Sequence, residues 1–80
     1  MTYGVPTKRS VTIAGHETSI SLEPAFWRAI EAAALEAGLP LNALIARIDV
    51  ERLGSDPPPN LTSAIRQWLF ARGRGGPQST

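Results

Sequence analysis

The sequence predicts a mainly α-helical fold that begins with a short β segment. Two stretches near the N-terminus alternate apolar and polar residues, as strands with one buried face do; their apolar positions are Val11, Ile13, Ile20 and Leu22. Three later stretches place apolar residues at helical spacing and are separated by Gly and Pro. We therefore expect a β segment followed by three helices.

Residues 14–17, Ala-Gly-His-Glu, separate the two alternating stretches. A loop of two to five residues that contains Gly is typical of a β-hairpin, in which residues 8–13 would extend the sheet. One kinked strand with a bulge at Gly15 fits the same pattern. In that case residues 18–22 form an isolated strand, and its backbone N–H and C=O groups must find a partner elsewhere.

The first helix is expected to begin at Pro24, which suits a first helical turn because its missing N–H is not needed there. It should end at Gly38, a favourable residue just past a helix end. A second helix is expected over about residues 40–51. The apolar positions at helical spacing are Phe26, Ile30, Ala33 and Ala37 in the first helix, and Leu41, Leu44, Ile45 and Ile48 in the second.

A connector of residues 54–60 contains three consecutive prolines and cannot be helical through them. Asn60 or Thr62 is expected to cap a third helix that ends at Gly73. Its apolar residues are Leu61, Ile65, Trp68 and Leu69.

With 80 residues the chain forms one small domain, over residues 8–72, with a flexible arm at 1–7 and a disordered tail at 73–80. So small a core is usually supplemented by disulfides, a metal or oligomerisation. The chain has no Cys, and His16 is its one histidine, which leaves oligomerisation. We predict no metal and no cofactor. The sequence also shows no catalytic triad, carboxylate pair or phosphate-binding Gly loop, so we do not expect an enzyme.

The net charge is +1, with basic ends and an acidic middle. No stretch approaches the roughly 20 apolar residues of a membrane span, and the N-terminus has no apolar signal region. We expect a cytoplasmic protein of bacterial type that has no membrane partner.

The order strand, helix, turn, helix over residues 18–50 resembles the ribbon-helix-helix family, and "GLPLNALIARI" (Gly38 to Ile48) is similar to its turn and second helix. The longer "KRSVTIAGHETSISLEPAFW" resembles a subgroup with an added segment before the ribbon. The resemblance implies an intertwined homodimer, in which the strand pairs with its copy in an intermolecular antiparallel ribbon. The implied dimer core is Ile20, Leu22, Phe26, Ile30, Leu44, Ile45 and Ile48.

The same resemblance implies a sequence-specific transcriptional regulator, a repressor, that places its ribbon in the major groove of double-stranded DNA. Ser19 and Ser21 would face the bases, because side chains alternate along a strand. Lys8 and Arg9 would contact the DNA backbone. The first amides of the second helix, at Leu41, Asn42 and Ala43, would bind a phosphate.

Two departures favour an alternative function. Serines discriminate bases less well than Arg or Asn, and Pro40 stands where the family often has a Ser or Thr cap. The alternative is a protein-interaction or dimerisation module with the same fold and little or no DNA binding. A protein partner would then dock on the third helix, through Trp68, Leu69 and Phe70, or on residues 11–13.

Overall fold

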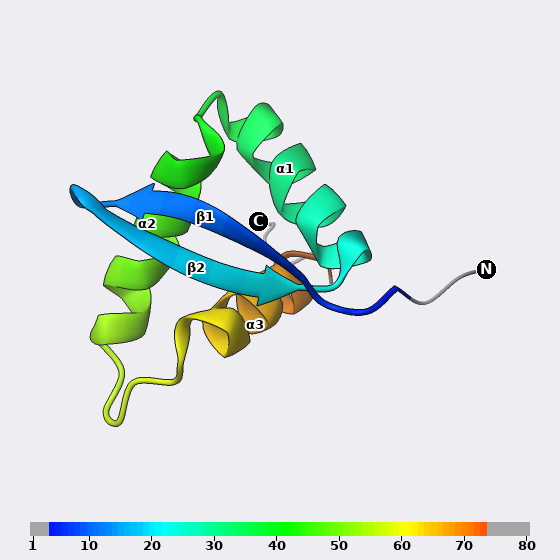
Figure 1. The fold of residues 1–80 in the computed structure, drawn as a ribbon. Coiled ribbons are helices and arrows are strands. Elements are labelled where there is room, and N and C mark those ends of the chain that lie inside the picture. Colours follow the sequence, from blue (N-terminus) through cyan, green and yellow to red (C-terminus); the bar gives the residue numbers. More distant parts are fainter. Residues whose placement is uncertain (1–3, 74–80) are drawn as a thin grey trace.

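A computed structural model describes residues 4–73, in which a β-hairpin is followed by three helices (Figure 1). The elements are β1 (Thr7–Ile13), β2 (His16–Leu22), α1 (Pro24–Ala37), α2 (Leu41–Leu53) and α3 (Leu61–Gly73). Residues 1–3 of the predicted arm and residues 74–80 of the predicted tail lie outside the described residues.

Of the two alternatives for residues 8–22, the hairpin is the one observed. β1 and β2 pair antiparallel from Thr7 opposite Leu22 to Ile13 opposite His16. The turn consists of Ala14 and Gly15, whose φ angles of 51° and 83° are both positive. Two positive values are characteristic of the type I′ turn, whose twist matches that of the flanking strands. Residues 8–13 therefore extend the sheet.

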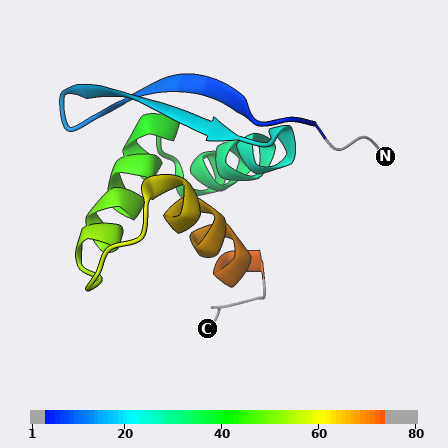
Figure 2. The ribbon, with the colours of Figure 1, turned by 60° about the horizontal axis from the view of Figure 1, so that its bottom comes forward.

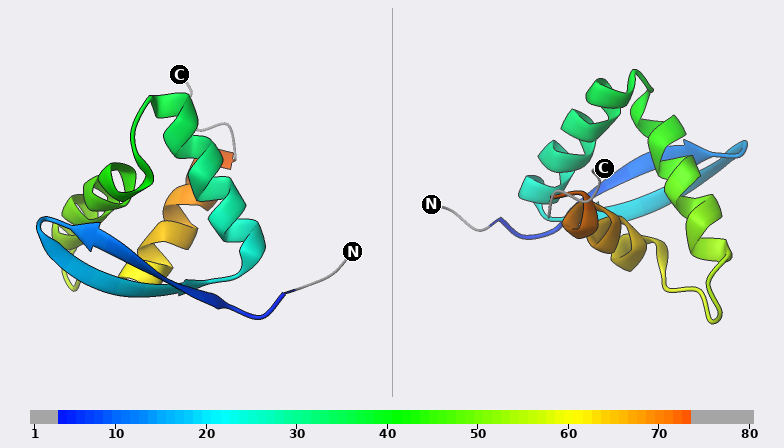
Figure 3. Two further views of the ribbon diagram at one scale, coloured as in Figure 1. Left: turned by 45° about the horizontal axis from the view of Figure 1, so that its top comes forward. Right: turned by 180° about the vertical axis from the view of Figure 1, so that it is seen from behind.

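The hairpin forms one layer and the three helices form a second (Figure 2). β1 lies over α2, and β2 lies over α3 and the start of α1. Seen from behind, the helices cover the inner face of the hairpin (Figure 3). One face of the hairpin is thus covered by protein, and the other faces away from it.

The core between these layers contains residues from all five elements. Its thirteen buried apolar residues are Val11, Ile13, Ile20, Leu22, Trp27, Ile30, Ala33, Ala34, Leu44, Ile45, Ile48, Ala64 and Ile65. Leu22, Ile30, Ile45 and Ile65 are fully buried, at 0% exposure. At roughly 1.5–3 kcal/mol for each large apolar side chain, this burial is the main force that holds the hairpin on the helices.

Specific residues set the helix ends. After α1, Gly38 has a φ of 70°, and the Leu39 amide donates to the Ala34 carbonyl at 2.9 Å, which closes the helix. Of the two predicted caps for α3, Asn60 is the one observed: its Oδ1 accepts from the Ser63 amide at 2.7 Å. The proline-rich connector is held by Arg52, which pairs with Asp49 at 2.7 Å and donates to the Pro59 carbonyl at 3.2 Å.

Trp27 joins the hairpin to α1. Its side chain is 3% exposed, and its indole N–H donates to the Thr7 carbonyl at 2.8 Å. The Arg9 guanidinium lies over the indole, 4.3 Å from the ring centre, and pairs with Glu31 at 3.0 Å. The start of β1 is thereby anchored by a hydrogen bond, a cation–π contact and an ion pair.

One edge of β2 pairs with β1 of its own chain. The resemblance implies that residues 18–22 also pair with their copy in a second subunit; this pairing stays a prediction, because the structure describes a single chain and the other edge of β2 is not paired with any described strand. A two-residue turn brings β1 alongside without the entropy cost of association. Of the predicted dimer-core residues, six are buried within the single chain, and Phe26 is half-buried.

No single helix of the described chain is long and apolar enough to cross a membrane. Only α1 and α2 taken together have the length and apolar composition of a span, and they are bent by 98° relative to each other.

Candidate nucleic-acid interface

The outer face of the hairpin consists of six polar side chains. Strand alternation turns Val11, Ile13, Ile20 and Leu22 inward, so the residues between them point outward. The register places them opposite one another in three cross-strand pairs, which are Lys8 with Ser21, Ser10 with Ser19, and Thr12 with Glu17. This face includes the predicted contacts Ser19, Ser21 and Lys8.

These six side chains have no partners within the described part of the chain. Five are exposed and Ser21 is half-buried. None forms a hydrogen bond or an ion pair with another described residue. Each hydroxyl can both donate and accept, so the face offers hydrogen-bonding groups of both kinds to a ligand.

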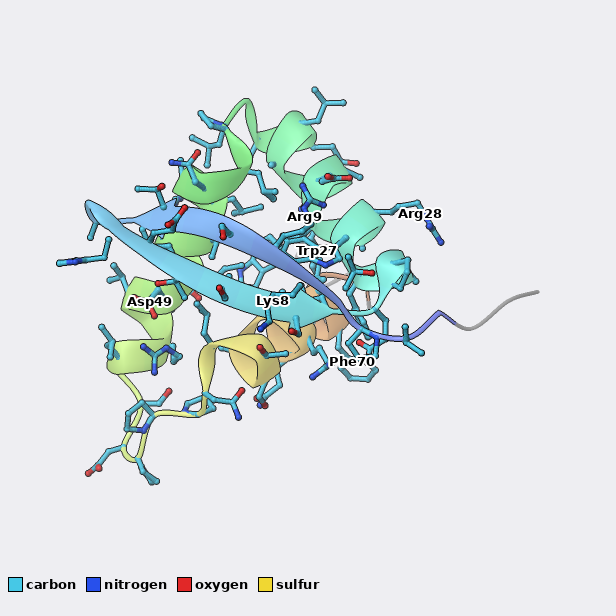
Figure 4. The ribbon with its side chains drawn as sticks, viewed as in Figure 1. Lys8, Arg9, Trp27, Arg28, Asp49 and Phe70 are labelled. Atoms are coloured by element: carbon cyan, nitrogen blue, oxygen red, sulfur yellow. The ribbon has the colours of Figure 1, made fainter. Side chains whose placement is uncertain are left out.

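The face carries one cation and one anion, and they lie apart. Lys8 is near the open end of the hairpin and projects from the outer face (Figure 4). Glu17 is next to the turn, paired with Thr12. An anionic ligand would therefore be held most strongly toward the open end.

Arg9 lies on the opposite face from Lys8, since neighbouring residues of a strand point to opposite sides. Its guanidinium is engaged by Trp27 and Glu31 in the partly exposed contact described above. The structure therefore separates the two predicted backbone contacts: Lys8 is on the outer face, and Arg9 joins β1 to α1.

The predicted phosphate site at the start of α2 lies on the β1 side of the hairpin (Figure 1). Pro40 precedes the helix and provides no side-chain cap. The Ala43 amide, one of the three predicted donors, is already bonded to the Pro40 carbonyl at 3.0 Å. The amides of Leu41 and Asn42 precede this bond and have no backbone acceptor in the described chain, so two of the three donors are available.

Two residues of the face, Ser10 and Thr12, were not predicted as contacts. The prediction assumed that the second strand of the ribbon would come from another subunit, and only Ser19 and Ser21 were assigned. The alternation of Ser10 and Thr12 with Val11 and Ile13 was the available signal, because it matches the alternation in β2.

An ion pair joins the end of the hairpin to α3. Arg66 donates to Glu23 Oε1 at 2.8 Å. This hydrogen bond, with a smaller contribution from the Glu23 backbone amide, holds the pKa of the Glu23 carboxyl below its usual value, although partial burial opposes the shift. Because the pKa is lowered, this contact stabilises the fold fully at pH values above the ordinary carboxyl pKa. The stabilisation is lost as the pH falls through the lowered pKa of the folded state.

Replacing Glu23 with Gln is therefore expected to reduce the loss of stability that acid pH causes. The unfolding temperature of the unmodified chain should fall further between about pH 7 and about pH 3 than that of the variant. Thermal unfolding followed by circular dichroism measures both, and Glu51→Gln, at an exposed acid on α2, is the matched control. Equal acid losses in Glu23→Gln and the unmodified chain would contradict a stabilising role for this pair.

The described residues contain no cluster of three or more His, Asp or Glu side chains that could hold a metal ion.

Comparison with known families agrees with this geometry. The ribbon-helix-helix domain matches residues 6–72, which includes both strands and nearly all of α3. No curated protein and no solved structure matches the chain. The family consists in general of DNA-binding regulators of transcription and is not enzymatic. The match covers most of the sequence and fits the observed order of strands and helices, and the chain therefore belongs to the ribbon-helix-helix family.

Proposed function

We propose that this protein is a sequence-specific DNA-binding repressor of transcription, which acts as a dimer in the bacterial cytoplasm and places the outer face of its hairpin in the major groove. The observation that carries the proposal is the set of six outward side chains without partners in the described chain, on a hairpin whose other face is held by the core. The family consists in general of DNA-binding proteins, and this membership supports DNA as the ligand.

The dimensions of the hairpin support this placement. Paired strands lie about 4.8 Å apart, and a groove about 12 Å wide admits a two-stranded ribbon. Ser10, Ser19 and Ser21 lie along the middle and open end of the face, where their hydroxyls can bond to base edges. Thr12 adds a methyl group that suits contact with thymine.

Phosphate contacts would flank the ribbon. Lys8 supplies a cation at the open end, and the free amides of Leu41 and Asn42 supply donors on the β1 side. Because phosphate contacts fix position and base contacts fix sequence, we assign Lys8 and the start of α2 to affinity and the hydroxyls to specificity.

Single substitutions on the face test this assignment. Lys8→Ala is expected to weaken binding to all DNA sequences and to lower the salt slope by about 1. Ser10→Ala and Ser19→Ala should each cost about 0.5–1.5 kcal/mol on the cognate site and relax its sequence preference. Gel-shift titration on the upstream DNA of its own gene, at two salt concentrations with unrelated competitor DNA, measures both effects.

Ser55→Ala is the matched control, since Ser55 is an exposed serine of the connector, away from the hairpin. It should change neither affinity nor preference. If the unmodified chain binds only weakly and loses all binding at physiological salt, the alternative of a protein-interaction module replaces this proposal.

A further inference from the structure

The ion pairs of the described chain leave three cations without a partner. Four arginines each bond to an acid, and these pairs are Arg9 with Glu31, Arg52 with Asp49, Arg66 with Glu23 and Arg72 with Glu36. The other cations among residues 4–73 are Lys8, Arg28 and Arg47. None of them has an ion pair, a side-chain hydrogen bond or an aromatic contact within those residues, so all three are available to an anionic ligand.

Arg28 lies on α1, beside the start of β1. Trp27, the residue before it, donates to the first residue of β1, and Glu31, three residues after it, pairs with Arg9. Ile30 is fully buried and is two residues, or about 200° around the helix, from Arg28, which therefore points away from the core. Figure 4 shows the Arg28 side chain extending from α1 at the end of the molecule that contains the open end of the hairpin.

The pairing of Arg9 with Glu31 leaves Arg28 free. Glu31 is the one acid within four residues of Arg28 along α1, at a spacing that allows an ion pair. Its carboxylate is instead bonded to Arg9 at 3.0 Å. The positive charge at this end of the molecule is therefore presented by Lys8 and Arg28, whereas the charge of Arg9, the second predicted backbone contact, is neutralised.

The unpaired acids of the described chain lie at the opposite end. They are Glu17 next to the hairpin turn, Glu51 in the last turn of α2 and Asp56 in the connector. The turn, the end of α2 and the connector are all on the side of the molecule opposite to the start of α1 (Figures 1 and 3). Arg47 is one helical turn before Glu51, so these two charges largely offset each other. An anionic ligand is thus attracted to the open end of the hairpin and repelled from the turn.

We propose that Arg28 contacts the DNA backbone beside the hairpin, so that the open end of the interface has two phosphate contacts, Lys8 and Arg28. This inference rests on the proposed function and adds to it a positioning residue that lies outside the hairpin. Phosphates border the groove that the hairpin would enter, so a cation beside the strands is placed to meet them. The guanidinium of Arg28 can donate two parallel hydrogen bonds to one phosphate.

Binding at several salt concentrations tests this contact. Fluorescence anisotropy measures the dissociation constant for a duplex from upstream of its own gene and for an unrelated duplex of equal length. Arg28→Ala is expected to weaken binding of both duplexes about tenfold and to lower the salt slope by about 1. Arg28→Lys keeps the charge, so it should keep the salt slope and lose less affinity. Because Arg28 bonds to no described residue, the unfolding temperature of both variants should equal that of the unmodified chain.

Arg47→Ala is the matched control, because it removes the same charge from an exposed position on a helix. Arg47 is two residues from the fully buried Ile45 and two from Asp49, which lines a pocket together with the hairpin turn. It therefore points away from both the core and the hairpin. Salt at about 0.15 M screens charges beyond about 8 Å, so Arg47→Ala should change the affinity by less than about twofold. Equal losses in Arg28→Ala and Arg47→Ala would show an effect of net charge alone and overturn the proposal.

A cleavage test locates the contact on the DNA. The chain has no Cys, so Arg28→Cys and Arg47→Cys each introduce a single thiol that can carry a tethered iron–EDTA reagent. On the upstream duplex, the reagent at position 28 should cut the DNA backbone at the border of the bound site. The reagent at position 47 should cut weakly or not at all, and equal cleavage from the two positions would count against the proposed placement.

These outcomes separate the contact of Arg28 from the proposed function. If the unmodified chain prefers its upstream duplex and Arg28→Ala retains the same affinity and salt slope, the function stands and the contact is rejected. Binding that depends on Arg28 but does not distinguish the two duplexes would retain the contact and reject sequence-specific regulation. An unmodified chain that binds neither duplex at low salt would reject both.

Discussion

Replacing Ile20 with Lys is expected to leave the chain unfolded. Ile20 is 2% exposed on the inner face of β2, among the apolar residues of the core. A buried ammonium group without a partner costs several kcal/mol, which is comparable to the 5–15 kcal/mol by which a typical domain is stable. Circular dichroism should show loss of the helical signal, and proton NMR should show loss of dispersed resonances.

Ser19→Lys is the matched control, because Ser19 precedes Ile20 and points to the opposite face. This variant should remain folded, with an unfolding temperature close to that of the unmodified chain. On the proposed function it should also bind unrelated DNA more tightly, since it adds a cation to the face that enters the negatively charged groove. A folded Ile20→Lys variant would contradict the observed packing of the inner face of the hairpin against the helices.

Replacing Ile65 with Ala is expected to lower the free energy of unfolding by about 2–5 kcal/mol, the usual cost of such a truncation in a core. Ile65 is fully buried on α3, which lies beneath β2. For a domain of this size, such a loss lowers the unfolding temperature by roughly 10 °C or more. Urea denaturation followed by tryptophan fluorescence measures the effect.

Leu53→Ala provides the comparison, because Leu53 is also a large apolar residue at a helical position but is 59% exposed. Leu53→Ala should lower the free energy of unfolding by less than about 1 kcal/mol. Similar losses in the two variants would show that α3 is not an integral part of the core.

The separate elements could be predicted from the sequence, because each has a local signal. Apolar spacing located all three helices, and Gly38 and Asn60 marked two of their ends. The second helix was expected over about residues 40–51 and is observed over Leu41–Leu53. Alternation also identified Val11, Ile13, Ile20 and Leu22 as an apolar face.

The packing of these elements could not be predicted in the same way. An alternating strand shows that its backbone needs a partner, but not which strand supplies it. The helical face that contains Ile65 indicated burial, but not that α3 would lie beneath β2. Arg9 was assigned by its charge and proximity to Lys8. Arg9 is two residues before Val11 and four before Ile13, so strand alternation places it on the same inward face, and this was the better guide to its orientation.

On the proposed function, the pairing of β1 with β2 changes the symmetry of the base sequence that one hairpin can recognise. In a ribbon made by two identical strands, every contact is repeated by the twofold axis, and the base sequence beneath it is palindromic. Within this hairpin the facing strands differ: Lys8 is opposite Ser21, and Thr12 is opposite Glu17. If the hairpin enters the major groove as proposed, the base sequence beneath one hairpin can therefore be asymmetric, and a substitution in one strand can change the base preference without altering the other strand.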